Sequence, residues 1–498
     1  MAAGEVKSRA AAGAVLIMGR GLAFQALGFL GNLVLARLLV PEDFGIVAVG
    51  LAVVSVGQLL AGAGLGSALV GREEPPTRVE LRALSGLQLV LTCSITTVAA
   101  AVAVGIGDDA LVTAVMVAAL PFTAIRTPAM LLFQRRLEFL VQLKVEIAEV
   151  VVYLAVAITL AALGMGAWSL AIATVVRALT GTIAAVTLSP LGFLVPSIRP
   201  SVVRPILGFG WRFQAVGVSQ LATETALTAG IASIAGLGVL GLWSLAQRLL
   251  AIPGLLFDSM WRVGFPAFSR LMQSGDEREI GALLERTVGT FAVAASAILC
   301  PLVASSPALV PLLFGAAWAD VSLVLPGAAI ALAIAGPIGM VSSSYFYARG
   351  DAGTGLRASL ITGACRLGVA LPLLPELGVA AIGLGWAAGA LASMAFVLRR
   401  ARRACGARLG RRVAGPVLSG AVGGAAGWIV ADSLGVTVPA ALLALLVAGA
   451  LWTLAMLLFA RGTLHDGVAM VRTVLGSAFG RARAFRRRTP VPVPSSSG

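Results

Sequence analysis

The sequence ARLLVPEDFG, which runs from Ala36 to Gly45, ends one long apolar stretch and begins another. The break between the two stretches holds Pro41 and the acidic pair Glu42 and Asp43. A helix of about 20 apolar residues is long enough to cross a bilayer. The break therefore predicts a short turn between two membrane-spanning helices, with acidic side chains at that surface of the membrane.

The same alternation continues along the chain and divides it into about fourteen apolar stretches separated by hydrophilic breaks. The predicted spans are 14–39, 44–70, 83–106, 110–133, 143–163, 166–188, 206–234, 238–262, 287–314, 322–348, 354–375, 378–400, 413–432 and 437–460. The first stretch has no small-residue cleavage pattern at its end, so we interpret it as a span and not as a removable signal peptide. The sequence thus predicts an all-α membrane protein.

Positive charges gather at every second break. These breaks and tails hold Lys7, Arg9, Arg72, Arg78, Arg82, Arg135, Arg136, Lys144, Arg199, Arg204, Arg262, Arg270, Arg278, Arg286, Arg349, Arg357, the arginines of 399–412 and those of 461–488. The other breaks hold Glu42, Asp43, Asp108, Asp109, Asp320, Glu376 and Asp432, with only Arg37 nearby. Loops rich in Lys and Arg stay in the cytoplasm. We therefore expect both termini to be cytoplasmic and the number of spans to be even.

The composition supports a multi-pass membrane protein. Hydrophobic residues make up 59% of the chain and charged residues 12%, whereas soluble domains carry about 25% charged residues. The net charge of +15 does not indicate nucleic acid, because the basic residues lie where the topology rule requires them. We expect the basic loops and tail to attract anionic membrane lipids.

Several chemical functions are disfavoured by what the sequence lacks. The four cysteines are scattered without metal-ligand spacing, and His465 is the only histidine. A histidine-ligated metal or a histidine-centred triad is therefore not expected. The sequence has no glycine-rich loop that ends in Gly-Lys-Ser/Thr, which disfavours ATP hydrolysis within the chain. We expect no cofactor and no enzymatic activity.

A weak internal repeat links two of the turns. The stretch Ala232–Gly241 follows the seventh predicted span as Ala36–Gly45 follows the first, and both end in a glycine. Repeated lobes place a substrate site at their interface near the middle of the bilayer. The predicted organisation is a cytoplasmic tail (1–13), an N-lobe of six spans (14–188), a C-lobe of six spans (206–400), two further spans (413–460) and a basic, Pro/Ser-rich cytoplasmic tail (461–498).

Charged residues inside the predicted spans are the candidates for function. The arginines are Arg20, Arg126, Arg177, Arg212, Arg248 and Arg366, and the acids are Glu146, Glu149, Glu224 and Asp258. A charge at the centre of a bilayer is costly, so such a residue faces a cavity or a partner. We predict a hydrated cavity that binds substrate through Arg126, Arg177, Arg212, Arg248 and Arg366. Because arginine binds phosphate through its fork of donors, the excess of arginine predicts an anionic substrate.

Other interpretations of these charges stay open at this stage. Arg20 and Arg212 lie near the cytoplasmic ends of their spans and could extend to the membrane surface. Glu146 and Glu149 could pair with Lys144 or Arg126. The deep arginines could also donate to carbonyls of neighbouring helices. Glu224 and Asp258 are candidates for ion coupling.

Five sequence segments resemble one known family. They are Leu35–Gly45, the span end Leu65–Val70, Leu240–Leu249 followed by Pro253, Phe265–Arg270, and Leu313–Trp318. Over residues 14–400 the chain is similar to Wzx-type polysaccharide (oligosaccharide) flippases of the multidrug/oligosaccharidyl-lipid/polysaccharide exporter superfamily. The resemblance implies two six-helix lobes, alternating access, and a polyprenyl-pyrophosphate-linked glycan as the cargo. It further implies a polysaccharide polymerase and glycosyltransferases as partners.

The chain departs from this family at one position. The family usually carries an Asp in the seventh span, where this chain has Leu227, and Glu224 lies one turn earlier. Ion coupling through that carboxylate is therefore uncertain. Three alternatives to an envelope-glycan flippase remain: a flippase for the peptidoglycan precursor lipid II, a drug/cation antiporter of the same superfamily, and a membrane scaffold that transports nothing. A cation antiporter is disfavoured because the deep charges are mostly arginine.

Overall fold

The computed structural model describes residues 26–62, 76–198, 200–271 and 277–466. These residues form helices joined by short turns, and no strand occurs among them. In chain order the helices are the 26–38 helix (Ala26–Leu38), α2 (Pro41–Gly62), α4 (Arg78–Ile106), α5 (Asp108–Val117), α6 (Leu120–Arg135), α7 (Phe139–Ala162), α8 (Ala167–Leu188), α9 (Pro200–Ile234), α10 (Gly236–Leu271), α11 (Glu277–Phe314), the 3₁₀ turn η1 (Ala316–Trp318), α12 (Val321–Ala348), α13 (Ala352–Leu377), α14 (Ala380–Cys405), α15 (Leu409–Leu434) and α16 (Val438–Phe459).

Eleven membrane-span candidates in the described part of the chain are long and apolar enough to cross a bilayer. Two shorter apolar helices, Ala26–Leu38 and Gly236–Ala251, accompany them. The fourth predicted span (110–133) contains an irregular turn between α5 and α6, directly before Pro121. Proline has no N–H, and its ring clashes with the preceding turn of a helix. The exact number of spans and the cytoplasmic placement of the termini stay predictions.

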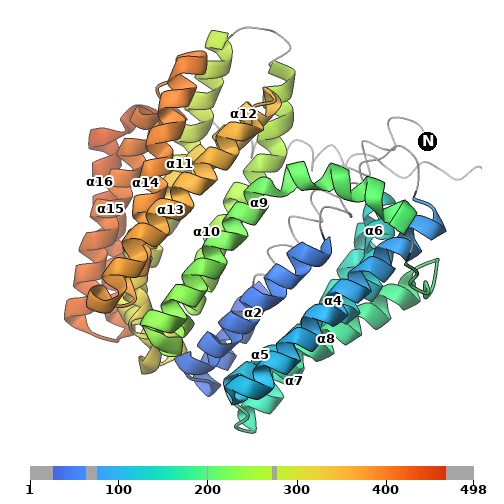
Figure 1. The fold of residues 1–498 in the computed structure, drawn as a ribbon. Coiled ribbons are helices and arrows are strands. Elements are labelled where there is room, and N and C mark those ends of the chain that lie inside the picture. The colour runs from blue at the N-terminus through green and yellow to red at the C-terminus, as the bar shows by residue number, and fades with distance from the viewer. Residues whose placement is uncertain (1–25, 63–75, 199, 272–276, 467–498) are drawn as a thin grey trace, which may run out of the picture.

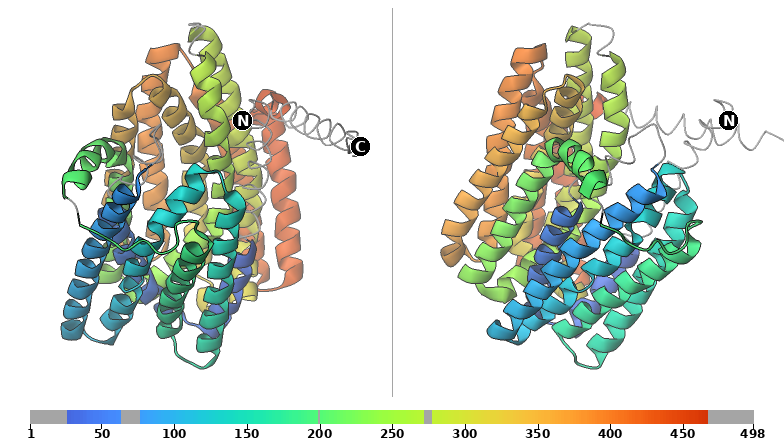
Figure 2. Two further views of the ribbon diagram at one scale, coloured as in Figure 1. Left: turned by 90° about the vertical axis from the view of Figure 1, so that its right-hand side faces the viewer. Right: turned by 45° about the vertical axis from the view of Figure 1, so that its right-hand side comes forward.

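The helices lie in two neighbouring groups (Figure 1). Helices α4 to α8 form one group and α10 to α16 the other, with α2 packed against α10 between them. Helix α9 bends, and its first part reaches across toward α4, which it contacts. Two further views show the same arrangement (Figure 2). The division into two lobes, 14–188 and 206–400, stays a prediction.

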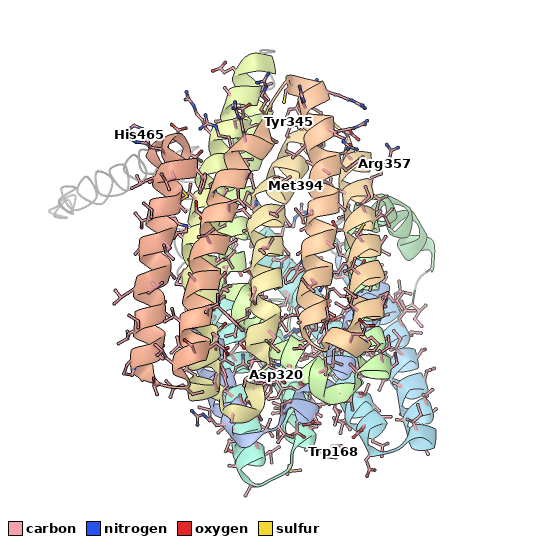
Figure 3. All side chains as sticks on the ribbon, turned by 90° about the vertical axis from the view of Figure 1, so that its left-hand side faces the viewer. Trp168, Asp320, Tyr345, Arg357, Met394 and His465 are labelled. Atoms are coloured by element: carbon pink, nitrogen blue, oxygen red, sulfur yellow. The ribbon has the colours of Figure 1, made fainter. Side chains whose placement is uncertain are left out.

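The two ends of the molecule carry different side chains (Figure 3). Trp168 and Asp320 lie at one end, and Arg357 and His465 lie at the opposite end. The basic tail that the sequence places from residue 461 begins as a helical turn, in which Asp466 accepts a hydrogen bond of 2.9 Å from Arg412. The remainder of that tail and the tail 1–13 lie outside the described residues.

The starts of α2 and α10 contact each other at the end that holds Asp320, and we call this contact the apex (Pro41–Gly45 and Leu237–Gly241). A Cβ atom on Gly45 would overlap the carbonyl of Leu237, and a Cβ atom on Gly241 would overlap the carbonyl of Pro41. Both glycines are therefore required for close backbone contact. The two repeated stretches pack against each other through equivalent positions.

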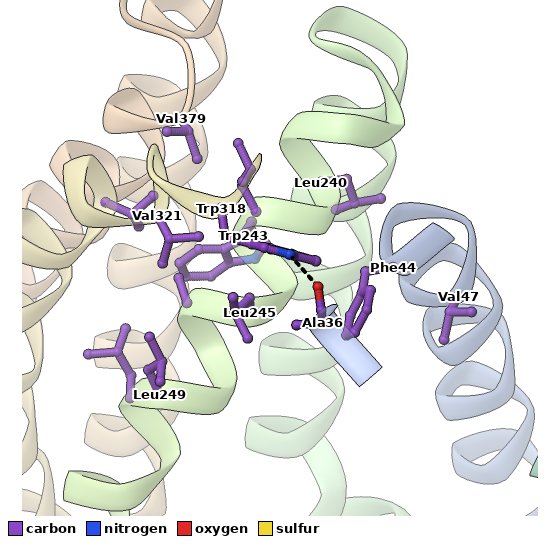
Figure 4. Packing of buried hydrophobic residues seen from close by; sticks show 14 of the residues in the cluster. Ala36, Phe44, Val47, Leu240, Trp243, Leu245, Leu249, Trp318, Val321 and Val379 are labelled. Atoms are coloured by element: carbon purple, nitrogen blue, oxygen red, sulfur yellow. Dashed lines mark hydrogen bonds between the residues drawn. The ribbon is translucent and has the colours of Figure 1, made fainter. Parts of the chain in front are cut away.

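Side chains join the apex to the end of α11. The Trp318 indole donates a hydrogen bond of 2.9 Å to the carbonyl of Ala36, and its ring meets Phe44 edge-on (Figure 4). Arg37 donates through Nε to the carbonyl of Leu313 at 2.7 Å and through Nη2 to that of Leu312. The last carbonyls of a helix have no partner within the helix. Arg37, the exception among the acidic breaks, thus caps α11.

Candidate functional site

Of the five arginines predicted to bind substrate, three line hollows, one forms an ion pair on a half-exposed surface, and one has no described side chain. Arg126, Arg248 and Arg366 each line a different hollow. Arg177 is about half exposed and pairs with an acid. Arg212 on α9 and Asp258 on α10 lie outside the described side chains, as does Arg20 outside the described residues. Their roles stay predictions.

Glu149 holds two of the arginines together in the first group of helices. Its side chain on α7 is buried, and Oε1 accepts a hydrogen bond from Arg126 on α6. Its Oε2 lies 3.5 Å from Nε of Arg177 on α8. The pairing of Glu149 with Arg126, one of the two options for this acid, is confirmed. The guanidinium of Arg177 also lies over the ring of Tyr153 at 5.9 Å.

Arg366 and Glu224 form a second ion pair, in the other group. Arg366 on α13 is only 4% exposed. It donates through Nη1 to Oε1 of Glu224 on α9, and Nη2 lies 3.4 Å from Oε2. Trp243 and Trp386 lie near the guanidinium, at 5.5 Å and 5.1 Å from its carbon to the ring centroids. The two ring centroids are 5.7 Å apart, so both rings lie on the same side of the guanidinium carbon. Cation–π contacts and the hydrogen bonds to the carboxylate together orient the guanidinium.

The Arg366 site still has unused hydrogen-bonding capacity. The buried Nε of Arg366 has no partner among the described residues. The ion pair lines a hollow of about 590 Å³ together with Gln220, Tyr347 and Ser359. Pockets that bind small molecules have volumes of about 300–1,000 Å³ and place a few polar groups in an apolar wall. This hollow has the size and the lining of such a pocket.

Arg248 differs from the other three arginines because its described partners are neutral. Nη1 of Arg248 donates to Oδ1 of Asn32 on the 26–38 helix. The guanidinium lies 4.9 Å from the ring centroid of Phe44 on α2. Arg248, Asn32 and Phe314 line a hollow of about 250 Å³. Arg248 thus brings a positive charge to the place where α10 meets helices from the other part of the chain.

The helix that carries Arg248 also contacts the carboxylate of Glu224. Gln247, the residue before Arg248, donates at 3.4 Å to the same carboxylate oxygen that faces Nη2 of Arg366. By contrast, Leu227 is fully buried in the apolar core. The position at which related sequences usually carry an Asp is therefore a packing position here, and Glu224 is the carboxylate that reaches the site.

Several site residues were not predicted from the sequence. They are Asn32, Phe44, Trp243, Trp386 and the glutamines Gln58, Gln88 and Gln134. Polar amides inside apolar stretches are a signal that the sequence does contain, because an amide buried without a partner is costly. The aromatic rings carry no such signal, since an aromatic residue in a span is usually a packing residue.

The described side chains form no metal-binding cluster, and their deep acids are paired with arginine. In the part of the chain that the structure covers, no three His, Cys, Asp or Glu residues gather closely enough to hold a metal ion. The deep acids Glu149 and Glu224 are each bound by arginine. The arrangement is suited to non-covalent binding of an anion, for which Arg248 and Arg366 supply the donors.

Comparison with known proteins identifies relatives of this chain. The family model described as "Polysaccharide biosynthesis protein" matches residues 34–323. The succinoglycan biosynthesis transport protein ExoT of Rhizobium meliloti (strain 1021) is 29% identical over 303 residues, which cover 57% of this chain and 58% of ExoT. The match therefore spans little more than half the length of this relative.

Solved structures show the same fold. The lipid II flippase MurJ in an inward closed conformation is 11% identical and matches with a TM-score of 0.67 over 90% of this chain and 100% of MurJ. An inward-facing multidrug resistance MATE family transporter of the MOP superfamily is 15% identical and matches with a TM-score of 0.59 over 76% of this chain and 94% of that chain. At these identities the likeness concerns the fold.

Proposed function

This chain belongs to the polysaccharide biosynthesis protein family. We propose that it is a flippase of the multidrug/oligosaccharidyl-lipid/polysaccharide exporter superfamily, with a polyprenyl-pyrophosphate-linked oligosaccharide as its cargo. It is a multi-pass protein of the bacterial cytoplasmic membrane. In the proposed function it carries the glycan headgroup across that membrane for envelope polysaccharide synthesis, where glycosyltransferases supply the cargo and a polymerase consumes it.

The observation that carries the proposal is Arg248 at the junction of the two helix groups, which has no anionic partner among the described residues. Its described partners, Asn32 and Phe44, carry no negative charge. An ion removed from water without a counter-ion costs several kcal/mol. A diphosphate bound at Arg248 would offset that cost, and its second phosphate could reach toward Arg366 along the side of α10 that bears Gln247.

Glu224 gives the site a way to bind and to release the cargo. In the proposed cycle, the diphosphate competes with the Glu224 carboxylate for the fork of Arg366. Both acceptors are anionic and both can accept two parallel N–H bonds. Helix α9 contacts both α13 and α4, so in the proposed cycle it shifts against α13 when the helix groups move. The carboxylate then returns to Arg366, and the diphosphate is displaced. The cargo is thereby held without being trapped.

The rocking of the two groups is the proposed route across the membrane. The glycine contacts and the Arg37 and Trp318 hydrogen bonds hold the apex closed in this structure. Alternating access would break these contacts and form others at the opposite end. The contacts at the apex are few, so they can break together when the two helix groups move.

The alternatives differ in what they require of the acids and the cargo. A cation antiporter needs deep carboxylates that are free to bind its cargo, whereas Glu149 and Glu224 are bound by arginine. Lipid II carries the same diphosphate chemistry, and the likeness to the MurJ fold keeps a lipid II flippase as the second candidate. A strain that lacks its lipid II flippase separates the two, because only a lipid II carrier would restore its growth.

Arginine variants test the proposed function in a strain whose surface polysaccharide depends on this protein. Export should fall in the order wild type, Arg→Lys, Arg→Ala at both Arg248 and Arg366, because lysine keeps the charge but loses the fork. A charged hydrogen bond contributes about 1.5–3 kcal/mol, so each alanine variant should lose roughly ten- to a hundredfold in cargo affinity. Arg403→Ala, at an exposed arginine, is the control. Normal export by both alanine variants at normal protein abundance would refute the anion site and leave a scaffold role.

A further inference from the structure

A second polar hollow lies in the first group of helices, away from Arg248 and Arg366. It has a volume of about 380 Å³ and lies between α2, α4 and α6. Its polar lining consists of Gln58, Gln88, Gln134, three threonines and Arg126. Polar side chains at membrane depth are costly unless they have partners or face a functional cavity. The concentration of amides and hydroxyls therefore requires an explanation.

Gln88 is the most informative residue of this hollow. Its side chain on α4 is 5% exposed, and its buried Oε1 has no hydrogen-bond partner in the described part of the chain. Native proteins leave few buried polar atoms without a partner. Because Gln88 lines the hollow, its free amide oxygen is available to a donor that enters from outside the protein.

The threonines of the hollow are acceptors and not donors. Thr92 donates its hydroxyl proton to the backbone carbonyl of Gln88 at 2.7 Å. Thr123 and Thr127 donate theirs to the carbonyls of Leu120 and Thr123, at 2.7 Å and 2.9 Å. A hydroxyl that has donated its proton still has lone pairs for an incoming donor. With the amide groups of the glutamines, the wall offers several acceptors and a smaller set of donors.

The charge of this hollow is balanced, unlike that at Arg248. Arg126 is the charged side chain in the lining, and it is bound by Glu149, which also faces Arg177. Glu146 lies one turn before Glu149 on α7. Two acids thus accompany two arginines, which makes the wall polar without an excess of positive charge. A neutral ligand with many hydroxyl groups suits such a wall better than an anion does.

We propose that the hollow between α2, α4 and α6 binds the sugar hydroxyl groups of the glycan, with Gln88 as the residue that accepts from them. This inference rests on the proposed function and adds that the two helix groups bind different parts of the cargo. The diphosphate is held by Arg248 and Arg366 in one group, and the sugars are held by the glutamines and threonines in the other. Each sugar hydroxyl both donates and accepts, which matches the side-chain amides of glutamine.

Gln88→Leu is the decisive variant, because leucine has a similar size and needs no hydrogen bond. If Gln88 were a packing residue, its replacement would be neutral for function. We expect the variant to unfold at the same or a higher temperature than wild type, since it removes an unpartnered polar atom. Gln142→Leu is the matched control, because Gln142 on α7 is also 5% exposed and does not line this hollow.

The binding test compares two ligands that differ only in the glycan. One is the polyprenyl-diphosphate-linked glycan purified from membranes of the producing strain, and the other is the same polyprenyl diphosphate without a glycan. Wild type should bind the first at least about tenfold more tightly, a difference equivalent to one good hydrogen bond or more. Gln88→Leu should remove this difference and leave the bare lipid diphosphate bound as before, while Gln142→Leu should behave as wild type. Equal discrimination by Gln88→Leu and wild type would overturn the inference.

A second measurement keeps the inference separate from the proposed function. Gln134→Cys, in a chain whose native cysteines are replaced by alanine, places a thiol at the exposed rim of the hollow. The released glycan alone should slow maleimide labelling of this thiol, and should fail to do so when Gln88→Leu is also present. If neither lipid binds to wild type but the glycan protects, the flippase cargo is wrong and the sugar site stands. If both lipids bind and the glycan gives no protection, the sugar site is wrong and the diphosphate site stands.

Discussion

At the scale of single residues, the Arg366–Glu224 pair has the most direct consequence for transport. Two hydrogen bonds join Arg366 to Glu224, and two tryptophan rings lie near the guanidinium. An acid that keeps an arginine occupied lowers the affinity of that arginine for any other anion. The strength of cargo binding should therefore depend on Glu224 as much as on the arginine itself.

Glu224→Gln should strengthen binding of a polyprenyl diphosphate and slow export. The amide still accepts one hydrogen bond from Arg366 but no longer competes as an anion, so affinity should rise by roughly tenfold, the equivalent of about 1.4 kcal/mol. Binding to the purified variant and export in cells are the two measurements. Glu376→Gln changes an exposed acid of α13, the helix that carries Arg366, and serves as the control. Weaker diphosphate binding by Glu224→Gln would contradict competition at Arg366.

One residue-level prediction that rested on charge, the pairing of Glu149 with Arg126, is confirmed. Burial cost alone indicated that Glu149 needed a partner, and Arg126 provides one. The same reasoning could not foresee the pairing of Glu224 with Arg366, because the two lie on helices far apart in the chain. Gln88 was not predicted as a site residue, because its amide carries no full charge. A buried amide without a partner is nevertheless costly, as a buried charge is.

At the scale of secondary-structure elements, the glycines at the starts of α2 and α10 determine how closely the two helix groups approach. Gly241→Ala should separate the apex, because its Cβ would overlap a backbone carbonyl that cannot move aside without shifting α2. Forcing extra atoms into a packed contact costs about 1–3 kcal/mol. The closed apex should therefore lose population to an open one.

Cross-linking across the apex measures this effect. A cysteine pair at positions 44 and 240 should form a disulfide more slowly in the Gly241→Ala chain than in the unmodified chain. Gly254→Ala lies on the same helix with open space around the position, and it should leave the rate unchanged. Equal rates in all three chains would show that the glycines do not control closure.

Asp351 caps the start of α13 outside the membrane-spanning segments. Its Oδ1 accepts from the N–H of Thr354 at 3.1 Å, and its Oδ2 accepts from the Thr354 hydroxyl at 2.6 Å and from Arg400 at 3.2 Å. These bonds, led by that from the Thr354 side chain, hold the pKa of Asp351 below its ordinary value. The carboxylate therefore stabilises the folded state above the ordinary aspartate pKa, and this contribution is lost as the pH falls through the lowered value.

Asp351→Ala should lower the free energy of unfolding by about 1 kcal/mol at neutral pH, the usual cost of losing a helix cap. The difference between variant and wild type should shrink on acidification, because the protonated carboxyl group no longer caps as an anion. Thermal unfolding in detergent at pH 7 and near pH 3 provides the measurement. A gap that is the same at both pH values would show that the cap acts only through its neutral hydrogen bonds.

Helix positions were more predictable than helix ends. Hydropathy located the apolar stretches because a bilayer demands about 20 apolar residues. It could not locate the true ends of α10 and α11, which run past the predicted spans to Leu271 and back to Glu277. A helix continues into water wherever its own hydrogen bonds and neighbours support it. The interruption before Pro121 follows from proline chemistry.

At the scale of the whole molecule, the separation of acidic and basic ends predicts the orientation in the membrane. Asp109 and Asp320 belong to the acidic set, and Cys405 lies among the arginines of 399–412. Cysteines placed at 109 and 320 should react with an impermeant maleimide added to intact cells, whereas the native Cys405 should react only after the cells are opened. Labelling of Cys405 in intact cells would contradict the predicted topology.

The architecture could be predicted from the sequence in outline, and the site only in part. The weak repeat at Ala36–Gly45 and Ala232–Gly241 pointed to two related halves, and the structure brings these two stretches into contact. A single cavity shared by all the deep arginines was expected, whereas Arg126, Arg248 and Arg366 line separate hollows. A hydropathy pattern indicates how deep in the membrane a residue lies. It does not indicate which neighbouring helix the residue faces, because that depends on how the helices pack.

The apex also bears on how such a chain could have arisen. Contacts between equivalent positions are the mark of a two-fold dimer of identical polypeptides, in which each position near the axis faces its own copy. Glu42 now lies against Gly238, its counterpart in the second stretch. In a symmetric dimer the same glutamate would face another glutamate, and like charges repel at such short range. Duplication and fusion into one polypeptide remove that restriction, so each side of the contact can change its sequence alone while the shape of the contact is kept.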